Sequence, residues 1–201
     1  DYSKLNYISQ KFFPHSKILT IKMIDAGLIN QTYIVECLQD GAKSKFILQK
    51  LSNIFESHQF VNINHKVITD HITRKTNNNI FYSKRWEVPT LIKCKSNDLF
   101  YLTFNSEFWR AIIYIDQTLN VNLLEDNDMA YQTGIGLAKF HLICSDLDCT
   151  ELKNNIKNFH DTNFYIDKYI YSIKNYFLSE LDSDVYKRLQ ILNNSLSKHV
   201  S

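Results

Sequence analysis

The sequence predicts an α+β protein in which an antiparallel sheet comes first and helices follow. Short runs of β-branched and apolar residues, separated by turn residues, dominate the chain up to about residue 115. After about residue 120, apolar residues recur instead at the three- and four-residue spacing of amphipathic helices. Because strands and helices are segregated along the chain, we expect two lobes, at residues 1–115 and 116–201.

Composition excludes several classes of protein. The chain of 201 residues is 44% hydrophobic and 13% aromatic, which is enough for a buried core. The net charge of +2, with four arginines among 23 basic residues, argues against nucleic acid or a membrane surface as the main partner. No apolar run approaches the roughly 18 residues of a membrane span. The four cysteines lack a Cys-x-x-Cys spacing and no signal peptide is recognisable, so we expect reduced thiols and a cytoplasmic location.

The first lobe begins with three strands, predicted at residues 17–25, 32–37 and 45–51. Asp40-Gly41 between the second and third strands is a turn signal, so these two should form a hairpin. The connection between the first and second strands holds Gly27, one of only four glycines in the chain.

The rest of the first lobe is predicted to be one helix and more strands. Residues 57–73 are helical in period, with Phe60, Ile63, Val67 and His71 on one face. Residues 90–94 and 99–104 are expected to pair through a turn, and the apolar run at 108–115 suits a buried strand. We therefore expect a sheet of about five strands with one helix.

Three helices are predicted after residue 120. The acidic segment Glu125–Asp128 favours a helix start, and that helix should run to about residue 146. Asp161 or Thr162 can cap the second helix. The apolar faces of the second and third helices are formed by Ile166, Tyr169, Ile170, Ile173 and Phe177, and by Val185, Leu189, Leu192 and Leu196.

Most familiar catalytic patterns are absent from the sequence. The seven histidines do not form the His-x-x-x-His pair of a helical zinc site, and no Gly-x-Ser-x-Gly elbow is present. The cysteines lie in apolar runs, where burial usually leaves them inert. The segment Gly27–Thr32 combines Gly, Asn and Thr between two strands, and such a loop can offer N–H groups to phosphates. Taken alone, this pattern is more often a plain hairpin loop.

The order of the elements strengthens the phosphate interpretation. The loop is followed by a strand that carries Gln49 and Lys50, then by a helix and two strands. An apolar strand finally runs into Tyr114-Ile115-Asp116. The nucleotide-binding lobe of a kinase has the same order of parts: a loop that covers the phosphates, a strand with a polar or cationic group, a helix and a linker.

Six segments carry a resemblance to a known family, and they cover most of residues 20–170: residues 27–33, 46–55, 64–72, 109–118, 130–134 with Phe140, and 159–162. In these segments the chain resembles the aminoglycoside phosphotransferase and choline kinase group of small-molecule kinases. Within this group it is most similar to the N-acetylhexosamine 1-kinase-like branch. The resemblance implies a protein-kinase-like fold, with a sheet lobe followed by the first helices of an α-helical C-terminal lobe.

The activity implied by the resemblance is ATP-dependent phosphoryl transfer, with Mg²⁺, to a hydroxyl of a sugar such as an N-acetylhexosamine. Gly27, Asn30 and Thr32 would lie over the phosphates, and Tyr114 and Ile115 would flank the adenine.

Other site residues implied by the resemblance remain open. Either Gln49 or Lys50 would take the place of the family's strand-three cation, because strand alternation puts them on opposite faces. Asp70 is the only carboxylate inside the first helix that could pair with that cation. His160 and Asp161 are candidates for the sugar side.

The sequence departs from the family at the catalytic loop. No His-Gly-Asp motif is present, and His160-Asp161 matches a family segment that precedes that loop. We therefore expect the catalytic Asp and the Mg²⁺ ligands beyond Ser201, and little phosphoryl transfer by this chain alone. Two alternatives stay open: a non-catalytic kinase-like binding module, and a kinase for another acceptor, such as an aminoglycoside, choline or homoserine.

Overall fold

A computed structural model describes residues 1–24, 27–77, 86–118, 121, 123–175 and 183–197. Contacts divide the chain into two compact units, Asp1–Ile156 and Lys157–Ser201. The described residues contain an antiparallel six-stranded sheet and five α-helices, so the α+β class is confirmed. This division differs from the predicted lobes because the first helix after residue 116 contacts the helix that covers the sheet.

The chain starts with a helix that the sequence analysis missed, α1 (Tyr2–Phe12). The Asp1 side chain caps it by accepting a hydrogen bond from the Lys4 N–H at 3.3 Å. Ile8 and Phe12 are fully buried against one face of the sheet. The sequence predicts one helix in this half, and the described residues of this half contain two, α1 and the helix at His58–Asn77. Leu5, Ile8 and Phe12 at helical spacing are the signal that could have found α1.

The sheet has the strand order β1-β2-β3-β6-β4, with β5 paired to β6. The strands are β1 (Lys17–Ile24), β2 (Gln31–Gln39), β3 (Ala42–Lys50), β4 (Leu91–Ile92), β5 (Leu102–Phe104) and β6 (Glu107–Ile113). The predicted hairpin between β2 and β3 is confirmed. Asp40 and Gly41 both have positive φ at its turn, as the tight hairpin turns that match strand twist require.

The predicted pairing of residues 90–94 with 99–104 is wrong. One backbone hydrogen bond joins these segments, from Cys94 to Leu99, while β4 and β5 each form a ladder with β6. Asn105 and Ser106 have positive φ and make the tight turn that folds β5 onto β6. The sheet therefore has six strands among the described residues, and not about five.

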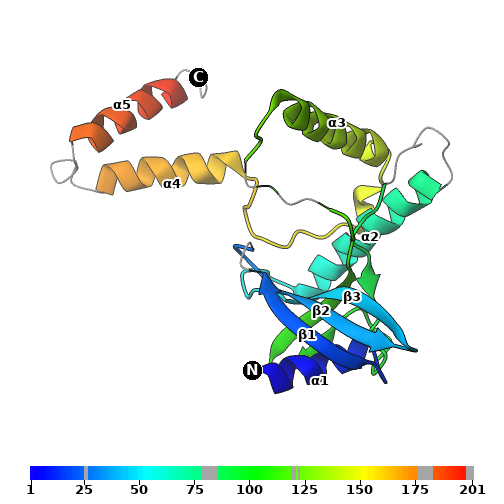
Figure 1. Ribbon diagram of the computed structural model, residues 1–201. Helices are drawn as coiled ribbons and strands as arrows, with labels where there is room; N and C mark the ends of the chain where they lie inside the picture. The colour runs from blue at the N-terminus through cyan, green and yellow to red at the C-terminus, as the bar shows by residue number, and fades with distance from the viewer. Residues whose placement is uncertain (25–26, 78–85, 119–120, 122, 176–182, 198–201) are drawn as a thin grey trace. The chain divides into compact units, whose positions relative to one another are not determined.

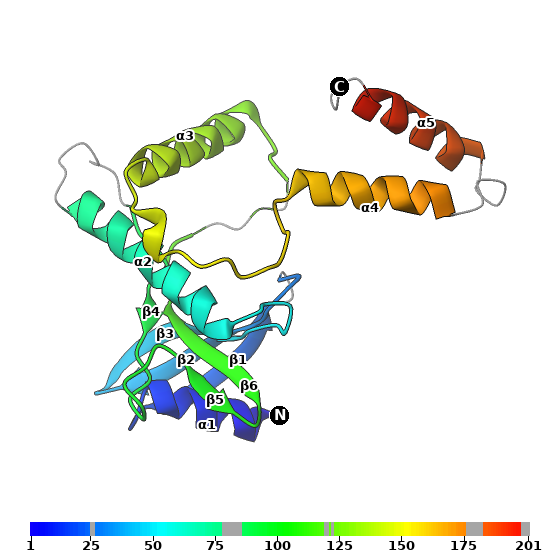
Figure 2. The same ribbon diagram turned by 180° about the vertical axis from the view of Figure 1, so that it is seen from behind.

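The two faces of the sheet carry different side chains, because successive side chains of a strand point to opposite sides. Val35, Phe46, Leu48, Trp109 and Ala111 form the core with α1. The opposite face carries Thr32, Gln49 and Arg110 and is partly covered by α2 (His58–Asn77). Figures 1 and 2 show α1 and α2 on opposite sides of the sheet.

Helix α2 confirms the helix predicted at residues 57–73. Of the face named in the sequence, His71 is buried and Ile63 is 41% exposed, and the polar side chains Asn62 and Thr69 are buried as well. The Asn62 amide donates to the Phe100 carbonyl at 3.2 Å and accepts from Arg110, so polar bonds attach this helix to the sheet. Helical periodicity of apolar residues cannot detect such a face.

Helix α3 (Asn127–Cys144) packs on α2 and is followed by a single 3₁₀ turn, η1 (Cys149–Glu151). Its predicted start is confirmed, since the Asp126 carboxylate accepts from the Met129 N–H at 2.7 Å. Buried Ile143 anchors it, and its carbonyl bonds to the His71 ring at 2.9 Å.

The second unit contains α4 (Thr162–Asn175) and α5 (Ser183–Ser197). Asp161 caps α4 by accepting from the Phe164 N–H at 3.0 Å, as predicted. The Tyr169 hydroxyl donates to the Leu189 carbonyl at 3.2 Å and joins the two helices. Phe177 lies outside the described residues, as do the side chains of Ile173 and Leu196. Among the helices described, none has the length and apolar composition needed to cross a bilayer.

Candidate functional site

The loop predicted to cover phosphates is held against the end of β3. The Asn30 side-chain oxygen accepts a hydrogen bond from the backbone N–H of Ser52 at 3.0 Å. A Cβ placed on Gly27 would lie 3.1 Å from the Asn30 carbonyl oxygen and 3.8 Å from the Thr32 hydroxyl. The loop therefore closes on itself around Gly27 and brings Gly27, Asn30 and Thr32 together.

Gln49, and not Lys50, shares the face of Thr32. Gln49 stands opposite Thr32 in the β2–β3 ladder, and its amide nitrogen donates to the Thr32 hydroxyl oxygen at 3.0 Å. Lys50 points to the other face, where its ammonium is 3.1 Å from the Glu107 carboxylate. Of the two residues, Gln49 is therefore the one on the loop side of the sheet.

Glu107 accepts hydrogen bonds from three side chains on the face of the sheet that packs on α1. Its carboxylate accepts from the ammonium of Lys4 at 2.5 Å, from Lys50, and from the Trp109 indole at 3.1 Å. The hydrogen bond from Lys4, followed by those from Lys50 and Trp109, lowers the pKa of Glu107. Lys50 is therefore part of a structural ion-pair cluster on the side of the sheet away from the loop.

The cation on the loop side of the sheet is Arg110, which the sequence analysis did not select. Arg110 stands opposite Gln49 in the β3–β6 ladder and is 7% exposed. Its Nε donates to the Gln49 side-chain oxygen at 3.0 Å. Its Nη1 donates to the Asn62 side-chain oxygen at 3.2 Å and contacts His65 Nδ1 at 3.4 Å. A charged residue at an inward position of the apolar run 108–115 was the available signal.

Burial affects the pKa values of both Arg110 and His65. Desolvation lowers the pKa of Arg110 to about 10, which still leaves the guanidinium charged at neutral pH. Desolvation also lowers the pKa of His65, and the nearby Arg110 charge acts in the same direction, while a hydrogen bond to the Pro89 carbonyl opposes both. A neutral His65 can donate to Pro89 through Nε2 and accept from Arg110 at Nδ1.

Among the described residues, the direction of these bonds leaves the Thr32 hydroxyl hydrogen without an acceptor. Arginine has no acceptor atoms, so the oxygen of the Gln49 amide must face Arg110 and its nitrogen must face Thr32. The Thr32 oxygen is then an acceptor for Gln49, and no described residue accepts a hydrogen bond from its own hydrogen. The loop end of this face therefore presents a hydroxyl group that Gln49 connects to the buried Arg110, one strand further away.

Three rows of side chains cross this face of the sheet. The first row is Thr32, Gln49 and Arg110, and the second is Ile34, Ile47 and Ile112. The third row is formed by Glu36 and Lys45, with Tyr114 next to them. The Lys45 ammonium is 3.4 Å from the Glu36 carboxylate and 5.5 Å from the centre of the Tyr114 ring. Adjacent rows are about 6.7 Å apart, since each is two residues further along the strands.

The third row borders a cavity of about 410 Å³, lined by Leu19, Glu36, Lys43, Ser44, Lys45, Tyr114 and Asp116. The structure thus puts Tyr114 and Ile115 just after β6, at the end of the sheet opposite to the loop. This face of the sheet therefore has a polar end at the loop, an apolar middle row, and a far end where Tyr114 lies among charged side chains.

Other candidate residues lie elsewhere. The Asp70 carboxylate pairs with Lys66 at 2.5 Å, one turn away on α2. His160 and Asp161 are exposed and belong to the second unit, where Asp161 caps α4. Within the described ranges, no cluster of His, Cys, Asp and Glu side chains is arranged to hold a metal ion.

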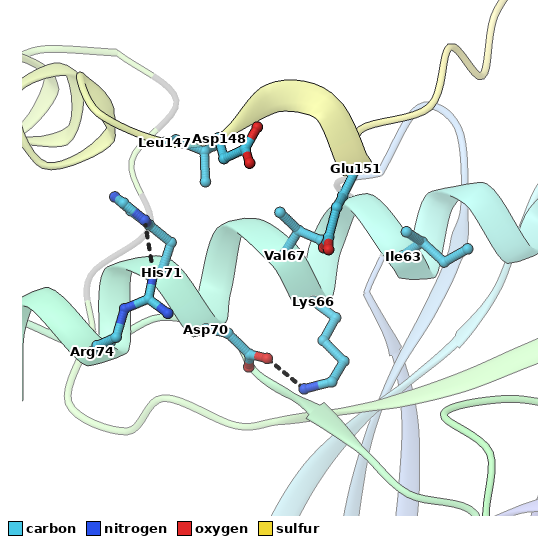
Figure 3. A pocket seen from close by; sticks show the side chains of 9 residues that line it. All are labelled: Ile63, Lys66, Val67, Asp70, His71, Arg74, Leu147, Asp148 and Glu151. Carbon is cyan, nitrogen blue, oxygen red and sulfur yellow. Dashed lines mark hydrogen bonds and ion pairs between the residues drawn. The ribbon is translucent and has the colours of Figure 1, made fainter.

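Asp70 lines a second cavity, of about 450 Å³, between α2 and η1 (Figure 3), with Ile63, Lys66, Val67, His71, Arg74, Leu147, Asp148 and Glu151. The charged groups of both signs here are partly engaged with each other. Lys66 pairs with Asp70, and Arg74 contacts His71 Nδ1 at 3.3 Å.

No known family model matches the chain.

Proposed function

We propose that this chain supplies the nucleotide-binding lobe of an ATP-dependent small-molecule phosphotransferase with a kinase-like fold. The acceptor would be a hydroxyl of a sugar such as an N-acetylhexosamine. One observation carries the proposal: the Gly27–Thr32 loop is held at the end of the sheet face that bears Gln49, Ile34 and Ile47. The observed order of loop, strand, helix and linker agrees with the layout that the family resemblance implies.

In this proposal, different residues of the sheet face bind different parts of the nucleotide. The Thr32 hydroxyl and the loop N–H groups donate to the phosphates, as backbone nests do for anions. Ile34 and Ile47 give an apolar surface for the base, with Tyr114 and Ile115 at its edge. Mg²⁺ bound to the phosphates would neutralise part of their charge. The sequence has no His-Gly-Asp motif, so we assign nucleotide binding to this chain and no phosphoryl transfer on its own.

Nucleotide binding can be tested by calorimetry and thermal shift with Mg-ATP and adenosine. A ligand at a hundred times its Kd stabilises the folded state by about 2.7 kcal/mol, which gives a clear shift. Thr32→Val removes the proposed donor while keeping the side-chain shape, and should weaken Mg-ATP binding about tenfold. Thr103→Val, on an exposed position of β5, is the matched control and should leave binding unchanged. No binding of Mg-ATP by the unaltered chain would overturn the proposal.

A non-catalytic kinase-like module is the second candidate. The observation that favours it is the engagement of Lys50 by Glu107 on the opposite face. The coding sequence after the Ser201 codon separates the two candidates. A His-Gly-Asp motif followed by Asn five residues later supports the enzyme, and its absence supports the module. The acceptor can then be sought with a panel of N-acetylhexosamines, aminoglycosides, choline and homoserine.

A further inference from the structure

Arg110 is a buried cation between the sheet and α2 whose contacts among the described residues are neutral. Its side chain bonds to two amides, Gln49 and Asn62, and to the His65 ring. Removing a charge from water is costly unless an opposite charge or many hydrogen bonds compensate it. No carboxylate in the described part of the chain forms an ion pair with Arg110.

Three carboxylates on the elements around Arg110 have other partners. Glu107 is on the other face with Lys4 and Lys50, and Asp70 pairs with Lys66. Glu36 lies two rows away from Arg110 and accepts from Thr20 and Lys45. The compensating negative charge is therefore not supplied by these groups, and the site suits an anion brought by a ligand.

The donors of Arg110 show where such an anion would bind. Nε and Nη1 make the three contacts given above, and no described residue accepts a hydrogen bond from Nη2. In the planar guanidinium, one N–H of Nη2 is parallel to the N–H of Nε, and together they form the fork that binds oxyanions. The Nε donor points to Gln49, so the neighbouring Nη2 donor points to the same side, where Gln49 leads on to Thr32 and the loop.

The three neutral partners orient the guanidinium without neutralising it. Asn62 and His65 are three residues apart on α2, and Gln49 is on β3, so the helix and the sheet together fix the plane of the fork. A preoriented donor loses little conformational freedom when it binds.

We propose that Arg110 binds the terminal phosphates of the nucleotide, in the role for which the sequence offered Gln49 or Lys50. This inference rests on the proposed function and assigns the electrostatic part of it to one side chain. Gln49 contributes by linking Arg110 to Thr32, which makes the guanidinium, the amide and the hydroxyl a single phosphate-binding row.

The test is the affinity of the full chain for ATP, ADP, AMP, adenosine and inorganic pyrophosphate, measured by calorimetry. Arg110→Met should weaken ATP and pyrophosphate binding roughly 10- to 100-fold, since a hydrogen bond to a charged group is at stake. The effect should shrink from ATP to AMP and vanish for adenosine. Arg74→Met, in the separate cavity between α2 and η1, removes the same charge and should leave all affinities unchanged.

A second variant keeps Arg110 in place and guards against misfolding. Gln49→Glu is isosteric, accepts the same Arg110 bond and puts a carboxylate beside the guanidinium. It should weaken ATP and pyrophosphate binding at least tenfold while adenosine binding is kept. Gln39→Glu adds the same charge at the exposed end of β2 and should have no effect.

The outcomes separate the two proposals. If Gln49→Glu binds ATP as tightly as the unaltered chain, the role of Arg110 is overturned and the nucleotide site stands. The same conclusion follows if both variants lose affinity for ATP and for adenosine to the same extent. Pyrophosphate binding that depends on Arg110, without adenosine binding, supports the anion site and overturns the nucleotide function. No binding of any of the five ligands by the unaltered chain overturns both.

Discussion

Gln49 and Thr32 face each other across β2 and β3, and the Gln49 amide nitrogen donates to the Thr32 hydroxyl at 3.0 Å. This bond connects the loop at Gly27 to the interior of the sheet, because the other end of the same amide accepts from Arg110. The neighbouring residue, Lys50, takes part in none of these contacts. The chemistry available at the loop is therefore set by which residue of the Gln49-Lys50 pair faces it.

Replacing Lys50 should affect stability and not ligand binding. The Lys50 and Glu107 side chains are 30% and 24% exposed, so solvent screens their interaction in part. We expect Lys50→Met to lower the free energy of unfolding by about 0.5–1 kcal/mol, measured by urea denaturation. Mg-ATP affinity should stay within a factor of two. A large loss of nucleotide affinity with little loss of stability would show that Lys50 reaches the ligand.

Two Gly→Ala substitutions should have opposite effects. A methyl group at Gly27 would meet the Asn30 carbonyl at 3.1 Å, whereas no atom lies within 4 Å of its place at Gly134 in α3. Gly134→Ala should raise the free energy of unfolding by about 0.5–1 kcal/mol, because alanine favours the helix. Gly27→Ala should instead lower both stability and Mg-ATP affinity. Equal stabilisation by both would argue against a close approach at the loop.

The role of α1 in the core can be measured by truncating Ile8. Ile8 is fully buried, and its replacement by alanine should cost about 2–5 kcal/mol through lost burial and an unfilled cavity. Leu28, fully exposed in the loop, is the matched control, and Leu28→Ala should change stability by less than about 0.5 kcal/mol. If both variants unfold at the same urea concentration as the unaltered chain, α1 is not part of the cooperative core.

Stability should depend on His65 at mildly acidic pH. Burial lowers the pKa of His65 below its ordinary value of 6.5, so the unfolded chain takes up the proton first as the pH falls. The stability contributed by neutral His65 is complete above about pH 6.5 and decreases as the pH falls through the lowered pKa. Urea denaturation between pH 7.5 and pH 5 measures this loss.

The matched substitutions for this pH dependence are His65→Gln and His141→Gln. His65→Gln should flatten the pH dependence, because an amide cannot titrate but can still accept from Arg110. His141, exposed on α3, should have no comparable influence. An unchanged pH dependence in His65→Gln would assign the acid sensitivity to another group.

The sequence determined the features that depend on neighbouring residues. Runs of β-branched and apolar residues located β1, β2, β3 and β6, and period-3.6 patterns located the helices after the sheet. Asp126 and Asp161 cap helices where their side chains predict it, and Asp40-Gly41 makes the expected hairpin turn. These signals act within a few residues along the chain, so tertiary contacts did not need to be known. The short helix α1 carried the same kind of signal but was not recognised.

Only the tertiary structure decided which side chains form the candidate site. Whether Gln49 or Lys50 faces the loop depends on pairing with Thr32 and on the Glu107 cluster, which lies 57 residues from Lys50 in sequence. Arg110 became a candidate because Gln49, 61 residues away, and Asn62, 48 residues away, surround it. The physical reason is common to both: burial and hydrogen-bond partners come from segments distant in sequence, and no local pattern specifies them.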